Sequence, residues 1–243
     1  MLLATFCLPF LGKKRRDKLV KHWSNTILLI LNVKLRVSGS LPPAGTPPAM
    51  FVSNHISWLD VWLVNSLLSP RFVAKSEVRS WPFIGWLSKQ GGVIFIQRAR
   101  KQDTLRVSGE ALQVLADGDS LCVFPEGTTT DGSFMVPFRS SLLQAVVDAE
   151  VLIRPMALRY PLPDGGVNVD VAYWGDITLW ESMLAMVKQP EITAELTFLL
   201  PIPTQGKDRR VLARRAESAI AELLRLPVRA ALQTPGGQLS AGP

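Results

Sequence analysis

The sequence predicts an α/β fold with a mixed, largely parallel sheet that is covered by helices and preceded by an N-terminal membrane-associated helical segment. Three observations favour this fold class. After residue 48, short apolar runs alternate with helical stretches, which is typical of strands that are buried on both faces. Hydrophobic residues make up 47% of the 243 residues, which is enough for a single large core. Residues 1–38 combine apolar runs with a basic cluster.

The N-terminal segment has two apolar parts. In MLLATFCLPFL the basic residues follow the apolar run, which is the reverse of a signal peptide. Eleven residues extend about 16 Å as a helix, whereas the hydrocarbon core of a bilayer is about 30 Å thick. Residues 18–35 then carry apolar side chains at helical spacing. Residues 1–38 are therefore expected to form membrane-associated helices, as a hairpin or an interfacial pair. The alternative is that the second helix packs on the catalytic domain.

The net charge of +7 is concentrated in two segments. Residues 13–21 hold six basic residues and one acidic residue, and residues 206–215 are also basic. Beside apolar helices, such clusters suit an anionic membrane surface, where each Lys or Arg contributes about 1 kcal/mol. A nucleic acid is not expected as a partner, because no platform of stacking aromatic residues accompanies the charge. The alternative for both clusters is a solvated helix face.

The rest of the chain divides at turn-forming residues. Residues 39–48, rich in Pro and Gly, form a linker, residues 49–226 form the main domain, and residues 227–243 are expected to be disordered. Pro155 suggests that its strand lies at an edge or contains a bulge. The expected strands are 49–53, 71–75, 92–96, 120–124, 152–158, 167–174 and 194–200. The expected helices are 58–68, 81–90, 101–116, 140–149, 179–187 and 208–226.

His55, one of only two histidines, lies between an expected strand and an expected helix, where open α/β sheets place their ligand sites. On one continuous helix, residues five apart differ by about 140°. His55 and Asp60 therefore meet only if His55 lies in the turn and Asp60 on the first helical turn, with Ser57 as the N-cap. In that geometry the carboxylate fixes one imidazole nitrogen and makes the other a general base. The alternative is a purely structural turn.

Two further segments carry polar groups just past expected strands. FPEGTTTDG, residues 124–132, predicts an exposed turn rich in hydrogen-bond donors, or else an ordinary β-turn. GGVIFIQRAR, residues 91–100, places Arg98 where it suits a phosphate or a carboxylate, or else is a surface cation. Cys7 and Cys122 suggest no disulfide framework, and no zinc-binding spacing occurs.

In combination and in this order, four segments resemble the conserved blocks of the glycerolipid acyltransferase superfamily. These are NHISWLD, GGVIFIQR, FPEGTT and IRPMAL, over roughly residues 50–158. The branch that the chain resembles most is the bacterial lysophosphatidate acyltransferases. The resemblance implies a membrane enzyme at the cytoplasmic face of the bacterial inner membrane. It would acylate the free hydroxyl of 1-acyl-glycerol-3-phosphate to give phosphatidic acid, with acyl-CoA or acyl-carrier protein as the donor and no cofactor.

The same resemblance implies the roles of individual residues. His55 would deprotonate the hydroxyl of the lysolipid, and Asp60 would orient the imidazole. The acceptor would be bound by residues of the first three blocks, namely Asn54, Ser57, Arg98, Glu126, Gly127 and Thr128.

Three alternatives to this function stay open. Many lysophosphatidate enzymes have Arg where this chain has Thr129, and an Arg that binds phosphate is not replaced conservatively by Thr. Either Arg98 alone suffices to bind the phosphate, or the acceptor lacks a phosphate. Lyso-ornithine lipid acyltransferases resemble the chain at this position, so a lyso-ornithine lipid is the alternative acceptor. A Ser/His/Asp lipid hydrolase is less expected, because the sequence lacks a G-x-S-x-G elbow and Ser57 is too near His55. The third alternative is a non-catalytic binding protein.

Overall fold

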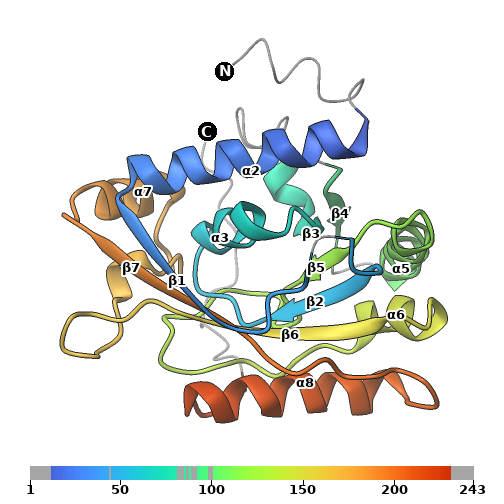
Figure 1. Ribbon diagram of the computed structural model, residues 1–243. Helices are drawn as coiled ribbons and strands as arrows, with labels where there is room; N and C mark the ends of the chain where they lie inside the picture. Colours follow the sequence, from blue (N-terminus) through green and yellow to red (C-terminus); the bar gives the residue numbers. More distant parts are fainter. Residues whose placement is uncertain are drawn as a thin grey trace.

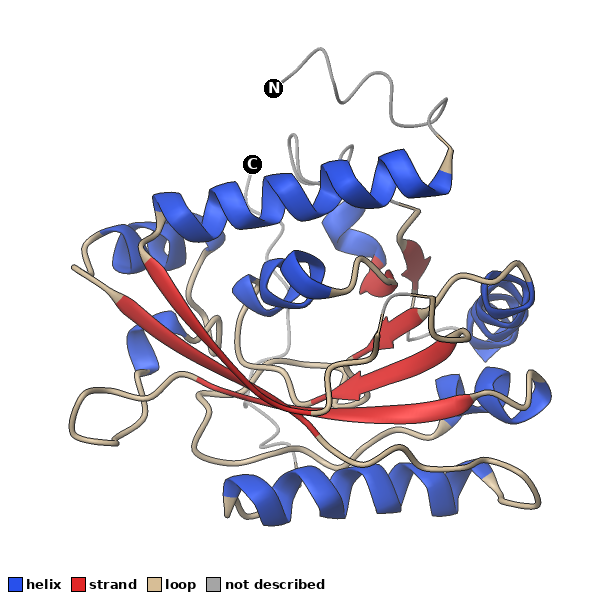
Figure 2. Ribbon diagram, in the orientation of Figure 1, coloured by secondary structure: helices blue, strands red, loops and turns tan. Residues whose placement is uncertain are grey.

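A seven-stranded sheet with helices on both sides dominates the computed structural model (Figures 1 and 2), which describes residues 12–43, 45–80, 85, 88, 92–97 and 101–230. The strand order is β1-β7-β6-β2-β5-β3-β4. The strands are β1 (Val33–Gly39), β2 (Ala49–Ser53), β3 (Arg71–Lys75), β4 (Ile94–Ile96), β5 (Leu121–Val123), β6 (Leu152–Arg159) and β7 (Ile192–Phe198). The α-helices are α2 (Lys13–Ile30), α3 (Leu59–Leu67), α5 (Lys101–Ala116), α6 (Gln144–Asp148), α7 (Leu179–Val187) and α8 (Arg209–Leu224). Short 3-10 helices are η2 (Ser76–Ser80), η3 (Ser141–Leu143) and η4 (Val169–Val171).

The strand pairing is parallel except between β6 and β7. This arrangement confirms the predicted mixed, largely parallel α/β sheet. β2 lies in the middle of the sheet, paired with β5 on one side and with β6 on the other. The carboxyl ends of β2, β5 and β6 therefore meet at one edge of the sheet, where the segments that follow them come together.

Two apolar cores lie on the two faces of the sheet. Every residue of β2 is buried, because successive side chains of a strand point to opposite faces and both faces are covered. Met50 and Val52 join the core beneath α8, whereas Phe51 joins the core that includes residues of α2 and α3. A strand of this kind has no polar alternation, which is why its sequence is continuously apolar.

The segment before the Pro/Gly linker contributes to the same sheet. α2 packs over α3, and its buried Leu28 belongs to the same apolar core as Leu59 and Leu63 of α3. β1 pairs with β7 at the sheet edge, which corrects the prediction of helices throughout residues 1–38. β1 ends at Gly39, whose φ is +74° and where a Cβ would lie 1.9 Å from the Phe198 carbonyl oxygen. In the described part of the chain, no helix is long and apolar enough to cross a membrane.

Two expectations about strands are corrected. Residues 167–174 do not form a strand, because the buried Asn168 bonds the Tyr160 carbonyl and Gln189 and the chain turns into η4. Pro155 does not lie in an edge strand, because β6 pairs on both sides. Ile153 pairs with Ile202, and Met156 pairs with Phe198. Two residues lie between Ile153 and Met156, whereas three lie between Phe198 and Ile202. The extra residue, and therefore the bulge, is in the segment that pairs with β6.

The remaining helices agree with the expectations, with small differences in their bounds. The expected helix 140–149 is divided into η3 and α6. Most of the expected helix 81–90 lies outside the described residues, as do residues 1–11 and 231–243.

Candidate active site

His55 and Asp60 lie in contact, in the arrangement that their spacing predicts. His55 follows β2 in the turn, and Asp60 lies in the first turn of α3. The His55 Nδ1 and Asp60 Oδ2 atoms are 2.8 Å apart. The histidine side chain is 20% exposed, whereas Asp60 is fully buried. In the described part of the chain, no hydrogen bond occupies Nε2 of the ring, so this nitrogen is the one available to a substrate.

The carboxylate of Asp60 receives four hydrogen bonds. Oδ2 accepts from the backbone N–H groups of Ile56 (2.8 Å) and Ser57 (3.0 Å) in addition to the His55 contact. Oδ1 accepts from the hydroxyl of Tyr160 at 2.6 Å. A buried carboxylate without such donors would be strongly unfavourable. Burial and the neighbouring Asp60 raise the pKa of Tyr160 well above its usual value, so this hydroxyl keeps its proton and remains a donor.

All four backbone hydrogen-bonding groups of His55 and Ile56 are paired. The His55 N–H donates to Glu126 Oε1 (2.7 Å) and its carbonyl accepts from the Thr130 N–H (3.0 Å). The Ile56 N–H donates to Asp60, and its carbonyl accepts from the Tyr173 N–H (2.9 Å). Segments far apart in sequence thus fix the position of this dipeptide. Such fixing keeps the imidazole in one orientation before the substrate arrives.

The His55 ring also stacks on Phe124. Their centroids are 4.0 Å apart and their planes differ by 9°. Phe124 follows β5, next to β2 in the sheet, and its ring lies 6.2 Å from that of Phe72 in β3. The stacked ring covers one face of the imidazole, and the Asp60 contact holds one edge. The reactive edge with Nε2 is left for the acceptor.

Glu126 supports the histidine turn from the inside of the protein. It is fully buried, with one oxygen accepting from the His55 N–H and the other from the Val136 N–H, each at 2.7 Å. Burial raises the pKa of Glu126 to about 8, against the lowering effect of these two donors. Both oxygens of Glu126 are thus engaged by backbone groups, and its role in binding the acceptor stays a prediction.

The other residues predicted to bind the acceptor fall into two groups. Asn54 is buried, and its amide donates to the Leu158 carbonyl (2.9 Å) and accepts from the Leu158 N–H (2.8 Å). Ser57 is not the predicted N-cap of α3, because the N-cap is Trp58; Ser57 is buried, and its hydroxyl accepts from the Leu59 N–H (3.3 Å). Gly127 and Thr128 lie in the turn after β5, where Gly127 has φ +74° and Thr128 is exposed.

Arg98 lies outside the described residues, so its predicted contact with the acceptor stays a prediction. Thr129, the residue that departs from the third block, donates its hydroxyl to the Tyr173 carbonyl. Sequence reasoning missed Tyr160 and Phe124 as parts of the site. Both directly follow strands that neighbour β2, Tyr160 after β6 and Phe124 after β5. Their position directly after these strands is the feature by which the sequence could have assigned them to the site.

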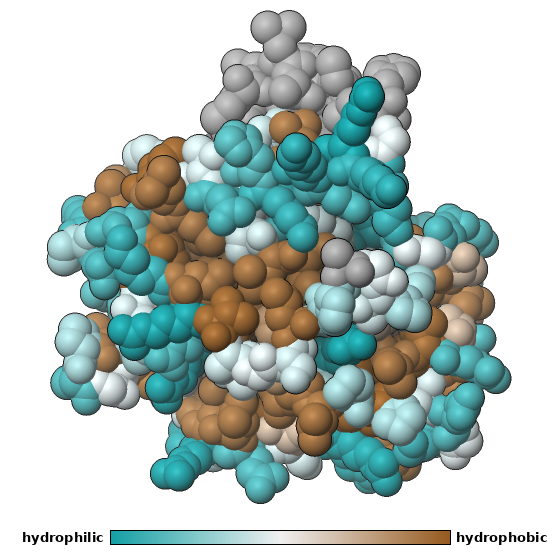
Figure 3. Space-filling view, viewed as in Figure 1, coloured by the Kyte–Doolittle hydropathy of each residue, from teal (hydrophilic) through white to brown (hydrophobic). Residues whose placement is uncertain are grey.

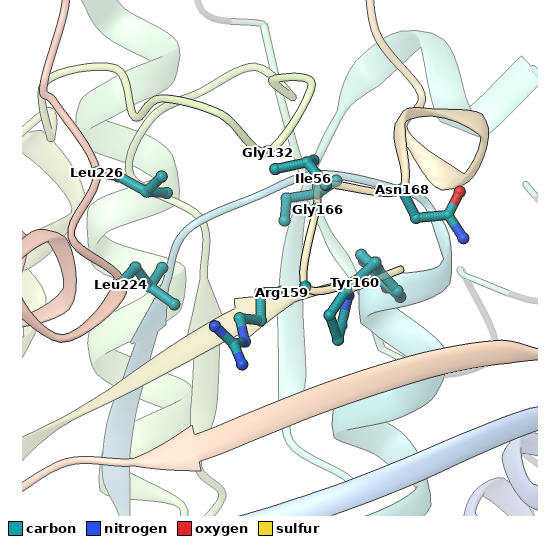
Figure 4. Close-up of a pocket in the computed structure, with 11 residues that line it drawn as sticks. Ile56, Gly132, Arg159, Tyr160, Gly166, Asn168, Leu224 and Leu226 are labelled. Atoms are coloured by element: carbon teal, nitrogen blue, oxygen red, sulfur yellow. The ribbon is translucent and has the colours of Figure 1, made fainter. Parts of the chain in front are cut away.

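A separate pocket lies behind the histidine turn. Ile56 and Gly132 lie together at one end of it, and Arg159 extends from β6 toward Leu224 (Figure 4). Arg159 Nε is paired with Glu195 Oε2 at 2.5 Å. His55 does not line this pocket. The pocket is therefore not the place where the imidazole meets a substrate.

This arrangement supplies one reactive group, an imidazole that a buried carboxylate orients for general base catalysis. Cys122 is a poor nucleophile, since it is fully buried in β5 and burial raises the pKa of its thiol. Cys7 lies outside the described residues. Ser57 has its hydroxyl turned to the start of α3. The site is typical of a class of enzyme in which a general base can activate a hydroxyl group directly.

Comparison with known proteins agrees with this class. Residues 34–159 match the family model described as Acyltransferase, a range that runs from β1 to the end of β6 and includes His55, Asp60 and Glu126. The chain belongs to this acyltransferase family, and it is an enzyme.

Relatives of two kinds resemble the chain. It is 34% identical over 205 residues to the lyso-ornithine lipid O-acyltransferase of Pseudomonas aeruginosa, with 84% of this chain and 78% of the relative covered. It is 27% identical over 206 residues to the 1-acyl-sn-glycerol-3-phosphate acyltransferase of Neisseria meningitidis, with 84% and 80% covered.

The fold also resembles a solved structure. This is the 1-acyl-sn-glycerophosphate acyltransferase PlsC from Thermotoga maritima, with a TM-score of 0.66 at 21% identity, covering 91% of this chain and 86% of PlsC. At this level of identity the likeness concerns the fold alone.

Proposed function

We propose that this acyltransferase moves a fatty acyl chain from acyl-CoA or acyl-carrier protein to the free hydroxyl of a lyso-ornithine lipid. The sequence alone favours lysophosphatidate as the acceptor, and the lyso-ornithine lipid is its alternative. The lyso-ornithine lipid is the better supported acceptor of the two. The reaction would take place at the cytoplasmic face of the bacterial inner membrane, where both donors are supplied.

The residue at position 129 is the observation on which the acceptor assignment rests. A phosphate acceptor calls for a cation that binds two oxygens at once, as Arg does. Thr129 provides neither charge nor length, and its hydroxyl is engaged by the Tyr173 carbonyl. Relatives named lyso-ornithine lipid O-acyltransferase support the same choice at 34%, 32% and 31% identity. Relatives named 1-acyl-sn-glycerol-3-phosphate acyltransferase match at 27%.

The proposed chemical step uses His55 as the only base. Nε2 takes the proton of the acceptor hydroxyl as its oxygen attacks the thioester carbonyl. The carbon–sulfur bond then breaks, the new ester remains on the lipid, and the thiolate leaves with the proton from the imidazolium. Asp60 holds Nδ1 at 2.8 Å throughout, which stabilises the positive ring that forms during the transfer. No acyl-enzyme is required.

One experiment tests the acceptor directly. Purified enzyme is offered lyso-ornithine lipid and lysophosphatidate in separate reactions, each with labelled acyl-CoA and with labelled acyl-carrier protein. We expect the ornithine lipid to be acylated with the higher kcat/KM, and we expect a His55→Ala preparation, which controls for host enzymes, to be inactive. Faster formation of phosphatidic acid would return the assignment to lysophosphatidate. Rapid release of free fatty acid without an acceptor would instead indicate a hydrolase.

A further inference from the structure

α7 exposes a continuous apolar stripe to solvent. Trp180, Met183, Leu184 and Val187 are 66%, 36%, 40% and 65% exposed. Residues separated by three, four and seven positions lie on the same face of a helix. The opposite face is anchored, because Ser182 and Met186 are fully buried. α7 therefore presents apolar side chains to solvent, although its other face is already buried against the protein.

A second exposed apolar group lies at the carboxyl end of α2. Leu29 is 79% exposed and Ile30 is 72% exposed. Asn32, just beyond α2, donates its side-chain N–H to the Pro190 carbonyl (2.5 Å) and accepts from the Ile192 N–H (3.2 Å), which brings the ends of α2 and α7 together. Figure 1 shows α7 beside this end of α2, and Figure 3 shows apolar surface at the upper left over the same elements.

We propose that the stripe of α7, together with Leu29 and Ile30, is a docking surface for an anionic lipid bilayer. The inference rests in part on the proposed function, because a lipid acceptor has to be reached in a membrane. The charge pattern supports this partner. Lys14, Arg15 and Lys18 of α2 are exposed, whereas Lys13 and Arg16 pair with Asp119, and the other end of α2 exposes apolar residues. A helix with basic and apolar parts of this kind suits the interface of an anionic membrane.

A second copy of the chain fits the stripe less well. A second copy of the chain would have to bury about 800 Å² for a standard interface. The nine residues of α7 extend about 14 Å, and four side chains on so short a helix provide too little area.

The stripe is also connected to the active site. Trp58, three residues from His55, donates its indole N–H to the Ser182 hydroxyl on the buried face of α7 (3.1 Å). Tyr173, a few residues before α7, bonds the Ile56 carbonyl. A bilayer that holds α7 would therefore hold the histidine turn at a fixed height relative to the lipid surface.

The test compares binding of the full chain to vesicles of phosphatidylcholine and phosphatidylglycerol by co-sedimentation. The variant Trp180→Asp/Val187→Asp places charge on the stripe, and Trp180→Phe/Val187→Leu is the matched control that keeps it apolar. Both leave the Thr178 and Glu181 cap of α7 intact. We expect the Asp variant to bind at least about tenfold more weakly and the control to bind like the wild type. Equal binding by all three proteins would overturn the proposal.

A second measurement does not depend on the Asp variant being folded. Brominated phosphatidylglycerol should quench tryptophan fluorescence more strongly in the wild type than in the variant Trp180→Phe. Equal quenching would contradict the docking surface. So would a wild-type dimer that the Asp variant converts to a monomer without change in vesicle binding, since this outcome would assign the stripe to a second copy.

Activity assays separate this inference from the proposed function. The Asp variant should acylate detergent-dispersed lyso-ornithine lipid at the wild-type rate and lose activity only toward acceptor embedded in vesicles. Equal loss in detergent and in vesicles would contradict a docking role. If wild-type enzyme binds vesicles as expected but fails to acylate lyso-ornithine lipid in detergent, the acceptor assignment fails while the docking surface stands.

Discussion

The hydroxyl of Tyr160 and the imidazole of His55 bind opposite oxygens of the same buried carboxylate, Asp60. The Tyr160 oxygen lies 2.6 Å from Oδ1, and His55 Nδ1 lies 2.8 Å from Oδ2. Tyr160 follows β6 and His55 follows β2, and these neighbouring strands run parallel. The sheet therefore brings together two residues that are 105 positions apart, and the buried Tyr160 is linked to the proposed base His55 through Asp60.

The variant Tyr160→Phe tests whether this link positions the base. Removing the hydroxyl deprives a buried carboxylate of one donor, and hydrogen bonds to charged groups contribute about 1.5–3 kcal/mol. We expect the free energy of unfolding to fall by about that amount and kcat to fall about tenfold with little change in KM. Denaturant unfolding and steady-state kinetics measure the two effects. A wild-type kcat in a destabilised protein would show that Tyr160 only stabilises the fold.

The variants His55→Ala and Asp60→Asn test the catalytic pair. His55→Ala removes the base, so acyl transfer should disappear. Asp60→Asn keeps the size of the side chain but loses its charge and its acceptor at one oxygen, and we expect kcat to fall by about 10²–10⁴. Circular dichroism checks that both variants remain folded. Transfer by folded His55→Ala at the wild-type rate would eliminate His55 as the base.

The sequence predicts the pair well because local geometry decides it. His55 in a turn and Asp60 on the first helical turn follow from a strand, a helix and a spacing of five. Glu126 shows what local sequence patterns do not predict. The FPEG turn was expected to be exposed because it is polar, but it folds back under the histidine turn and Glu126 is fully buried. A single sequence shows which polar groups a segment contains, but it does not show which distant backbone groups will form hydrogen bonds with them.

The missed strand β1 has a related cause. Its residues alternate between polar and apolar side chains directly after a helix, and β1 pairs only with β7, about 160 residues further on. The error at residues 167–174 is the opposite case. There, alternating apolar residues follow the strand pattern, but the hydrogen bonds of Asn168 to Tyr160 and Gln189 bend the chain into η4. Long-range contacts overrode the local pattern at residues 167–174, whereas β1 follows its own alternating pattern once β7 pairs with it.

The buried Glu126 predicts how stability depends on pH. Burial raises its pKa from 4.5 to about 8 in the folded protein. Between these values the folded protein holds a proton that the unfolded chain has lost, so the free energy of unfolding should decrease as the pH rises. The slope is at most about 1.4 kcal/mol per pH unit, and it should level off above pH 8.

Denaturant titrations of the variant Glu126→Gln from pH 5 to pH 9 measure this effect. We expect the variant to lose most of the slope, while the control Glu191→Gln at an exposed position keeps it. An unchanged slope in Glu126→Gln would mean that another group causes the pH dependence.

The variant Ser57→Ala distinguishes acyl transfer from serine hydrolysis. The Ser57 hydroxyl is buried and accepts from the Leu59 N–H, so its loss should cost about 0.5–1.5 kcal/mol of stability, as for a single neutral hydrogen bond. We expect kcat for acyl transfer to stay within about threefold of the wild type, since the base activates the acceptor directly. Complete loss of activity in a folded Ser57→Ala protein would instead support a serine nucleophile.

The last prediction concerns the acceptor preference at Thr129. Replacing Thr129 by Arg adds a cation that binds two phosphate oxygens, and we expect the ratio of kcat/KM for lysophosphatidate to that for lyso-ornithine lipid to rise about tenfold or more. The substitution also removes the hydrogen bond to the Tyr173 carbonyl. Thr129→Val is the matched control, because it loses the same hydroxyl without adding charge. Both variants are assayed with the two acceptors and one acyl donor.

The Thr129→Val control separates the effect of the added charge from the effect of losing the Thr129 hydroxyl. If both variants change the ratio equally, the Tyr173 contact shapes the acceptor site and the cation does not matter. If neither changes it, position 129 lies away from the acceptor, and the departure from the third block loses its value as evidence for a lyso-ornithine lipid. Only a rise in Thr129→Arg alone supports the view that this position selects between a phosphate and a phosphate-free acceptor.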